Sequence, residues 1–393
     1  MNFETLFLQH FYKSNKIMLK KIGGYSILVV ILLGIIYFFL PNYTQKALLY
    51  LTANIDDYEI FENRTVAASN PQPWLKSPQY NQYEMGQTYQ KEIESYETTA
   101  FLVVKDTALF YEKYYLGYDE NEVSNSFSAA KSIVSLLIGI AIEEGKIESV
   151  FQPVSDFLES FQEGEKSKII IKNVLTMSSG IEWNEAYMSP FSKTTDAYYG
   201  NNLKRLVEEL KVSEEPAQEF AYKSINTQIL AEVLEAATGQ SISEYATNRL
   251  WRKIGAESDA LWSLDREGGM EKAFCCFNST ARDFARIGQL ILNEGSWDGE
   301  QVVPAEYIEM ATMPARLIRS GEVIPHYGYQ WWILDYKGKQ IPYARGILGQ
   351  YIFVLKDKNA VVVRLGKSRS KLYTDEHPND VYTYVEAAYE LLK

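Results

Sequence analysis

The stretch SAAKSIVSLLIGIAIE, residues 128–143, is the most informative segment of this chain of 393 residues. Residues 129–143 are apolar on nearly every helical face, and Gly145 follows them, which is typical of a helix buried on all sides. Lys131 stands three residues after Ser128, so both side chains lie on one face of this helix. The segment therefore predicts a buried helix with a Ser–Lys pair at its N-terminus.

Such a pair can carry nucleophilic chemistry. Burial lowers the pKa of a lysine, and a neutral amine can accept the proton of a serine hydroxyl. The helix N-terminus offers an N–H group and a dipole to a developing oxyanion. The S-x-x-K pattern recurs at Ser368 and Lys371, in a polar and charged stretch where we expect a solvated loop. Taken alone, Ser128 and Lys131 fit a helix-cap serine and a snorkelling lysine equally well.

Two further segments supply groups that would complete such a site. Tyr222 and Ser224 precede a helical pattern, and one turn can point both into a cleft where the phenol relays a proton. Gly349 and Gln350 stand at the start of a predicted strand. A strand N–H that faces the N–H of Ser128 would complete an oxyanion hole.

The histidines and cysteines favour no other chemistry. His10 precedes an apolar segment with the pattern of a membrane span, so it could not reach a site on the other side of the membrane. A Ser-His-Asp site would therefore depend on His326 or His377. The G-x-S-x-G motif of many serine hydrolases is also missing. No HExxH motif or Cys/His cluster occurs, so we expect no metal and no cofactor. The adjacent Cys275 and Cys276 cannot close a loop, and we expect two small packed core residues.

The N-terminal segment has the pattern of a membrane anchor. Residues 22–40 are uncharged and almost wholly apolar, near the roughly 20 residues of a spanning helix. Four lysines precede them against one acid, so we expect residues 1–21 in the cytoplasm and everything after the span on the periplasmic or extracellular side. A cleaved signal peptide is the alternative, but no A-x-A-like cleavage site follows.

Composition bounds the class of protein. Hydrophobic residues make up 46% of the chain and charged residues 23%, which excludes a disordered chain. The net charge is -12 and no Lys/Arg tract occurs, which argues against a nucleic-acid partner.

The order of patterns predicts the α/β class, of the α+β type. We expect an antiparallel sheet flanked by helices, with an inserted all-helical subdomain at about 150–310 and the membrane helix in front. Residues 41–95 form a tether and packing arm, and residues 96–393 form the main domain. The expected elements are a hairpin at 99–104 and 108–115, strands at 328–334, 350–355 and 360–365, and a final helix at about 380–392.

The ordered set of Ser128-x-x-Lys131, Tyr222-x-Ser224 and a glycine-bearing strand resembles the serine β-lactamase and penicillin-binding-protein superfamily. The resemblance covers about 96–393. It extends to VLTMSSGIEW (174–183), LAEVLEAATG (230–239) and TARDFARIGQLILNEG (280–295), which are similar to the class C-type branch. The 6-aminohexanoate-oligomer hydrolases are the most similar group.

The resemblance implies the β-lactamase/transpeptidase-like fold and an acyl-enzyme cycle. Which of Lys131 and Tyr222 acts as the acylation base stays open. The implied roles are nucleophile for Ser128, proton transfer for Lys131 and Tyr222, hydrogen bonding for Ser224, and oxyanion binding for the N–H groups of Ser128 and Gln350 beside Gly349.

One departure from the superfamily bears on the substrate. Its β-lactamases and peptidases carry Lys-Thr-Gly, or a histidine for the lysine, where Ile347 and Leu348 precede Gly349 here. Without that cation a hydrophobic lip favours a neutral or extended acyl group, unless Arg345 or Lys367 turns inward. We expect a membrane-anchored hydrolase of a small-molecule or oligomeric amide or ester. The alternatives are β-lactamase or D,D-peptidase activity and a catalytically silent envelope-binding module.

Overall fold

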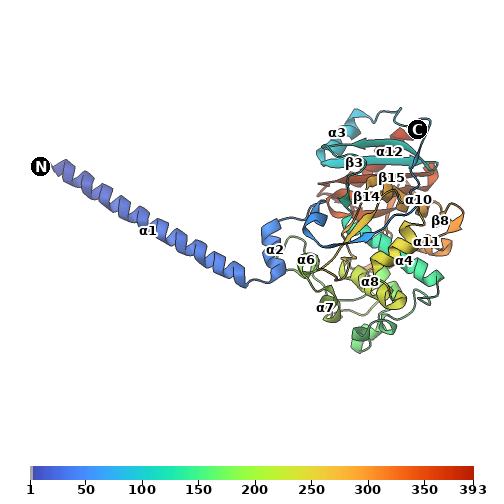
Figure 1. Cartoon of the computed structure of the whole chain (residues 1–393), viewed down its shortest axis with the longest axis horizontal. Coiled ribbons are helices and arrows are strands. Elements are labelled where there is room, and N and C mark those ends of the chain that lie inside the picture. Colours follow the sequence, from blue (N-terminus) through green and yellow to red (C-terminus); the bar gives the residue numbers. More distant parts are fainter. Residues whose placement is uncertain (1–2) are drawn as a thin grey trace.

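A seven-stranded sheet forms the centre of the computed structural model, which describes residues 3–393 (Figure 1). The strand order is β12-β13-β14-β15-β3-β4-β2, antiparallel except for the parallel pair of β2 and β4. The hairpin predicted at 99–104 and 108–115 is confirmed as β3 and β4, and the strands at 350–355 and 360–365 as β14 and β15. The strands are β2 (Leu75–Lys76), β3 (Thr98–Lys105), β4 (Ala108–Tyr114), β12 (Trp332–Tyr336), β13 (Lys339–Gly346), β14 (Gln350–Leu355) and β15 (Ala360–Gly366).

Helices cover both faces of this sheet, which is why its central strands are almost continuously apolar. One face packs on α10 (Ala281–Leu292), where Gly288 lets the helix approach closely, since an added Cβ would lie 2.4 Å from Val361 Cγ1. The other face packs on α12 (Asp380–Leu391), and α3 (Gln87–Ser95) lies beside α12 (Figure 1). The helix predicted at about 380–392 is thereby confirmed.

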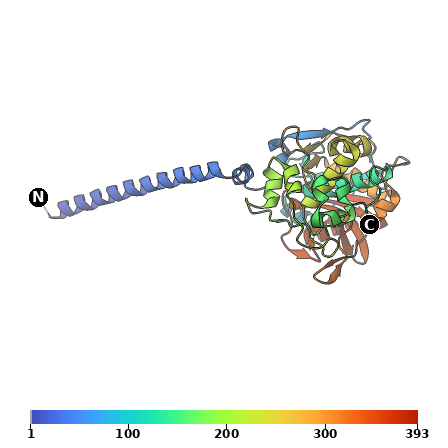
Figure 2. The same ribbon diagram turned by 90° about the horizontal axis from the view of Figure 1, so that it is seen from below.

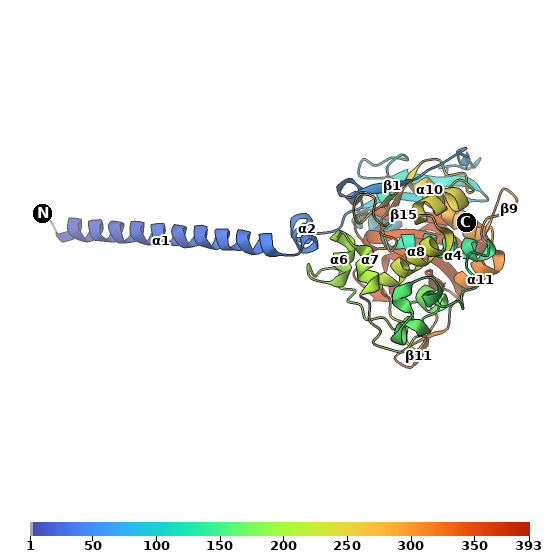
Figure 3. The ribbon, with the colours of Figure 1, turned by 60° about the horizontal axis from the view of Figure 1, so that its bottom comes forward.

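The helix predicted at 129–143 is α4 (Ala130–Glu143), and its residues 130–141 are all buried. It lies between the sheet and α8 (Ile225–Thr238), in the interior of the domain (Figure 3). Ser128 precedes it in the short turn η2 (Phe127–Ala129). The mixed fold with a central buried helix agrees with the predicted class.

A second sheet, of four strands, contains the strand that directly precedes this turn. Its order is β1-β6-β7-β5, and β5 (Ser124–Asn125) runs directly into η2. The expected all-helical insertion is therefore wrong in part, because β6 (Ala260–Ser263) and β7 (Phe277–Ser279) belong to this sheet. These strands are short and pair with β1 (Asn63–Val66) and β5, partners distant in sequence that no local pattern reveals.

Two other expectations differ from the structure. Residues 328–331 of the predicted strand form a turn, because Gly328 packs against the carbonyl of Ala311 and Gln330 has a φ of 62°. Cys275 and Cys276 are buried as expected, but a disulfide joins them.

The N-terminal helix α1 (Phe3–Phe39) stands away from the domain (Figures 1 and 2), and α2 (Asn42–Tyr50) follows it against the domain surface. The predicted span at 22–40 falls on α1. Residues 1–2, the start of the predicted cytoplasmic tail, lie outside the described part, as do the side chains of residues 3–6, 8–9, 14, 17–25 and 27. Among the described residues, no helix combines the length and the hydropathy of a membrane span.

Candidate active site

Lys131 is the centre of the site. Its Nζ lies 3.0 Å from Ser128 Oγ and 3.2 Å from Ser224 Oγ, and it donates a hydrogen bond of 2.7 Å to the carbonyl of Phe274. The lysine side chain is buried, with 1% of its surface exposed. Its amine therefore contacts two hydroxyl groups in a place that water hardly reaches.

The backbone around Ser128 is held by a buried amide. Asn125 Oδ1 accepts hydrogen bonds from the N–H groups of Phe127, at 2.8 Å, and Cys276, at 3.1 Å. Both donors have a positive φ, 44° at Phe127 and 64° at Cys276. Asn125 thus joins the turn that carries the serine to the segment whose Phe274 carbonyl holds the lysine.

The two proton-transfer candidates differ in their protonation. Burial lowers the pKa of Lys131 to about 7, and the charge of Glu185 opposes this shift. Burial raises the pKa of Tyr222, against a hydrogen bond with Ser128 and the positive charges of Arg345 and Arg369. At neutral pH the tyrosine keeps its proton while much of the lysine is a free amine, so Lys131 is the group able to accept a proton.

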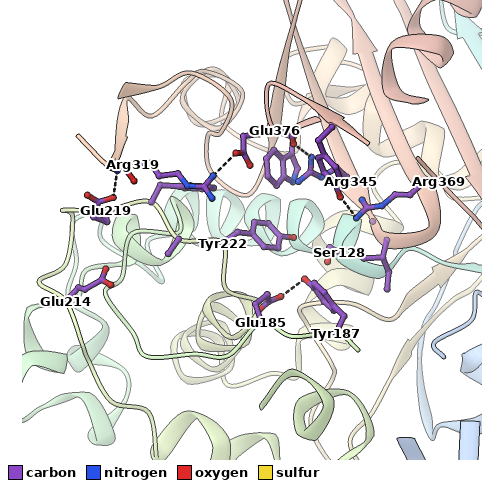
Figure 4. Close-up of a pocket in the computed structure, with 17 residues that line it drawn as sticks. Ser128, Glu185, Tyr187, Glu214, Glu219, Tyr222, Arg319, Arg345, Arg369 and Glu376 are labelled. Carbon is purple, nitrogen blue, oxygen red and sulfur yellow. Dashed lines mark hydrogen bonds and ion pairs between the residues drawn. The ribbon is translucent and has the colours of Figure 1, made fainter. Parts of the chain in front are cut away.

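Glu185 is a member of the site that sequence reasoning missed. Its carboxylate accepts hydrogen bonds from Ser224 N at 2.8 Å and Ser224 Oγ at 2.5 Å, and from the Tyr187 hydroxyl at 2.5 Å (Figure 4). It lies in an irregular loop with no motif, and the nearest signal in the sequence is a set of aromatic residues, Tyr187, Phe191, Tyr198 and Tyr199. Glu185 fixes the position of Ser224, and through it one hydrogen-bond partner of Lys131.

Two cavities meet at Ser128. The first, of about 650 Å³, is polar: Tyr222, Arg345 and Arg369 line it with several glutamates (Figure 4). The second, of about 330 Å³, is mainly apolar and receives side chains from α2 and from α6 (Lys193–Tyr199). Ile347 lines both cavities, at the end of β13.

The structure brings Ser128, Lys131, Tyr222 and Ser224 together, but it does not bring Gly349 and Gln350 to the cavities. The Gln350 side chain is buried and exchanges hydrogen bonds with Gly366, as acceptor at 3.2 Å and donor at 2.6 Å. Gly349, with a φ of 87°, lies against the guanidinium of Arg364, which donates a hydrogen bond of 2.7 Å to the Gly349 carbonyl. The turn after β13 places Ile347 at the site instead.

Two arginines place positive charge in the polar cavity, although the lysine of the Lys-Thr-Gly motif is absent from this sequence. Arg345 lines the polar cavity, with its guanidinium 3.2 Å from the Trp332 ring centroid, whereas Lys367 pairs with Asp56 at 3.7 Å. Arg369 also lines this cavity, although it belongs to the second S-x-x-K segment, whose Lys371 is exposed. No sequence pattern indicated Arg369, because its segment has the composition of a solvated loop.

The two remaining histidines belong to another part of the molecule. His326 and His377 line a separate cavity of about 260 Å³, and the His377 Nδ1 forms a hydrogen bond of 2.7 Å with the Tyr343 hydroxyl. Neither contacts Ser128, so a Ser-His-Asp site is not assembled.

Comparisons with known proteins identify the family of this chain. The beta-lactamase family model matches residues 87–380. The chain is 28% identical over 293 residues to the 6-aminohexanoate-dimer hydrolase of Paenarthrobacter ureafaciens, covering 70% of this chain and 74% of that protein.

Solved structures share the fold. A Bacillus anthracis protein assigned as a 6-aminohexanoate-dimer hydrolase has a TM-score of 0.74 at 22% identity, covering 86% of this chain and 92% of the other. A D-stereospecific amidohydrolase from Streptomyces has a TM-score of 0.58 at 15% identity, covering 76% and 97%. A family VIII carboxylesterase has a TM-score of 0.62 at 14% identity, covering 81% and 99%.

Proposed function

The chain belongs to the beta-lactamase family, and from this we propose that it is a serine hydrolase that cleaves an amide or an ester through an acyl-enzyme on Ser128. One observation carries the proposal: the buried Lys131 Nζ lies between the hydroxyls of Ser128 and Ser224, at 3.0 and 3.2 Å. The similarity to an amide hydrolase supports the same class of reaction.

The proposed cycle begins when neutral Lys131 accepts the proton of Ser128, whose Oγ attacks the substrate carbonyl. The N–H groups of Ser128 and Ile347 are our candidates to stabilise the oxyanion, because both residues line the cavities. Tyr222 keeps its proton at neutral pH and so can pass one to the leaving group. Water then attacks the acyl-enzyme and releases the acid.

Hydrolysis of p-nitrophenyl butyrate by the full-length protein tests the proposal. We expect turnover and labelling by a fluorophosphonate probe, and loss of both in Ser128→Ala. Ser368→Ala is the matched control, because it removes the serine of the other S-x-x-K segment and should keep turnover and labelling. Equal labelling of wild type and Ser128→Ala would refute the assignment of Ser128 as the nucleophile. No labelling of either would favour the silent binding module.

A second candidate function is β-lactamase or D,D-peptidase activity. The observation that favours it is the presence of Arg345 and Arg369 in the polar cavity, since either can attract a β-lactam carboxylate. Ser128-dependent turnover of nitrocefin would identify a β-lactamase. Stable labelling by fluorescent penicillin without turnover would identify a peptidase-like enzyme.

We also propose that the protein is attached to the cell membrane by its N-terminal segment, with the catalytic domain on the periplasmic or extracellular side. The uncharged run at 22–40 and the lysines before it support this location. The apolar side chains at 28–39 of α1 are exposed, among them Phe38 at 78% and Phe39 at 81%. Recovery of the full-length protein in the soluble fraction, without detergent, would contradict the attachment.

A further inference from the structure

The apolar cavity beside Ser128 has a wall from outside the segment that the family model matches. Ala47 and Leu48 of α2, and Leu51 just after it, line this cavity of about 330 Å³ together with Leu348. The family model begins at residue 87, so α2 precedes the matched segment. A cavity of this size and lining accepts an apolar group of a small-molecule ligand.

α2 is held firmly in this position. Thr44 is buried and its hydroxyl donates a hydrogen bond of 3.0 Å to the carbonyl of Pro190. The Tyr50 ring stacks on Tyr199, with centroids 6.0 Å apart. The cavity is therefore formed by packed residues of the domain.

The polar cavity on the other side of Ser128 carries two arginines whose guanidinium groups bind neutral oxygen atoms. Arg345 donates a hydrogen bond of 2.8 Å to the backbone carbonyl of Glu376, and Arg369 donates one of 2.9 Å to the Tyr373 hydroxyl. Within the described part of the chain, no carboxylate forms an ion pair with either guanidinium. Arg319, at the rim, differs because Glu376 pairs with it at 2.9 Å.

Tyr222 decides which half of a substrate enters which cavity. It lines the polar cavity and not the apolar one, and it is the proposed proton donor to the leaving group. The leaving group therefore lies on the side of Arg345 and Arg369, and the acyl group lies on the side of α2.

We propose that the substrate is an acylated amino acid or an acylated short peptide, with an apolar acyl chain against α2 and a leaving group whose carboxylate binds Arg345 and Arg369. This inference rests on the proposed function. Ser128 Oγ bonds to the acyl carbon, the C–N bond breaks, and the nitrogen takes the proton that left Ser128. Water then cleaves the ester, so the products are a carboxylic acid and a free amine that carries the anion.

The carboxylate is tested with N-octanoylglycine and N-octanoylglycinamide, which differ only in that group. We expect the full-length wild type to hydrolyse the acid with a kcat/KM about tenfold or more above the amide. Arg345→Gln and Arg369→Gln should each bring this ratio close to one. Arg252→Gln, which removes an arginine far from the cavities, should leave the ratio unchanged.

Binding of the acyl chain in the apolar cavity is tested with N-octanoylglycine and N-acetylglycine. We expect kcat/KM to be at least about tenfold higher for the longer chain, because its methylenes leave water. Ala47→Phe fills part of the cavity and should remove this preference, while retained turnover of N-acetylglycine reports an intact fold. Leu348→Asn is a second variant that suits the φ of 60° at this position and makes the wall polar.

The outcomes separate this inference from the proposed function. Ser128-dependent turnover of p-nitrophenyl butyrate, without preference for the carboxylate or the longer chain, overturns the substrate class and leaves the hydrolase standing. Failure to cleave either octanoyl compound, with the ester still hydrolysed, also overturns it. Absence of all turnover refutes the proposed function itself.

Discussion

Lys131 and Lys272 are buried to nearly the same degree, and only Lys131 contacts hydroxyl groups. Their exposed fractions are 1% and 0%, and burial lowers the pKa of both to about 7. Lys272 Nζ donates to the carbonyl of Leu264 and lies 4.2 Å from the centroid of the Phe61 ring. Lys131 donates to a carbonyl as well, but two serines complete its surroundings.

The comparison teaches that a lowered lysine pKa is a consequence of burial and does not by itself mark a catalytic group. What distinguishes Lys131 is that its amine reaches Ser128 at a place where two cavities open. Burial lowers the pKa of Lys272 as well, but among the described residues its amine contacts no hydroxyl that it could activate. The function of the site therefore follows from geometry, and the pKa only makes the geometry usable.

The largest expected effect comes from replacing each lysine by methionine. Lys131→Met should lower kcat/KM for p-nitrophenyl butyrate by about 10³-fold or more, because Ser128 loses its proton acceptor. Lys272→Met should keep the rate within about threefold, since it touches no reacting group. Steady-state hydrolysis with circular dichroism as a folding control measures both. A comparable loss in the two folded variants would contradict the distinction.

The pH dependence should follow Lys131 and ignore Lys272. A base works in its neutral form, so activity is present above the lysine pKa of about 7 and is lost as the pH falls below it. At about pH 5 we expect kcat/KM to be roughly 100-fold below its plateau, one factor of ten for each pH unit. Lys272→Met should show the same profile. A rate that is flat from pH 5 to 8 would exclude Lys131 as the base.

A smaller effect is expected at Glu185. Its negative charge raises the pKa of Lys131, so Glu185→Gln should lower that pKa and move the acid limb of the profile to lower pH. Glutamine keeps one oxygen acceptor for Ser224 and replaces the other with an NH2 group, so the substitution removes the charge and one of the two hydrogen bonds from Ser224. The limb is measured from kcat/KM between about pH 4 and 9. A shift in the opposite direction would show that Glu185 acts on the rate by another route.

The smallest effect concerns stability. Between pH 7 and 10.5 the unfolded chain holds a proton on Lys272 that the folded chain has released, so this lysine makes the free energy of unfolding rise with pH. Below pH 7 the folded chain carries a charged and buried Lys272, which lowers the free energy of unfolding. Lys272→Met removes this buried charge and should stabilise the fold by about 1–2 kcal/mol at that pH. The gain should shrink towards pH 10. Urea unfolding at pH 7 and 9.5 measures it, and an unchanged gain at the higher pH would contradict the assignment.

The central elements could be predicted from the sequence because their signals are local. The apolar run of α4 and the β-branched and aromatic runs of β3, β4, β14 and β15 are visible in the sequence itself, and Ser128 and Lys131 share one helix face. Glu185, Arg369 and α2 could not be predicted, because irregular loops and a separate helix bring them to the site. Gln350 could not be placed, because the short turn η7 (Ile347–Gly349) separates it from the end of β13, and Ile347 of that turn lines the cavities instead.

The position of α2 has a practical consequence for where this chain can be cut. A shortened protein that begins at Asn42 keeps the whole wall of the apolar cavity, whereas one that begins after Leu51 opens that cavity on one side. The shorter form retains Ser128, Lys131 and Tyr222, and so would still hydrolyse small esters. Activity measured on it would describe a broader and less selective enzyme than the chain encodes.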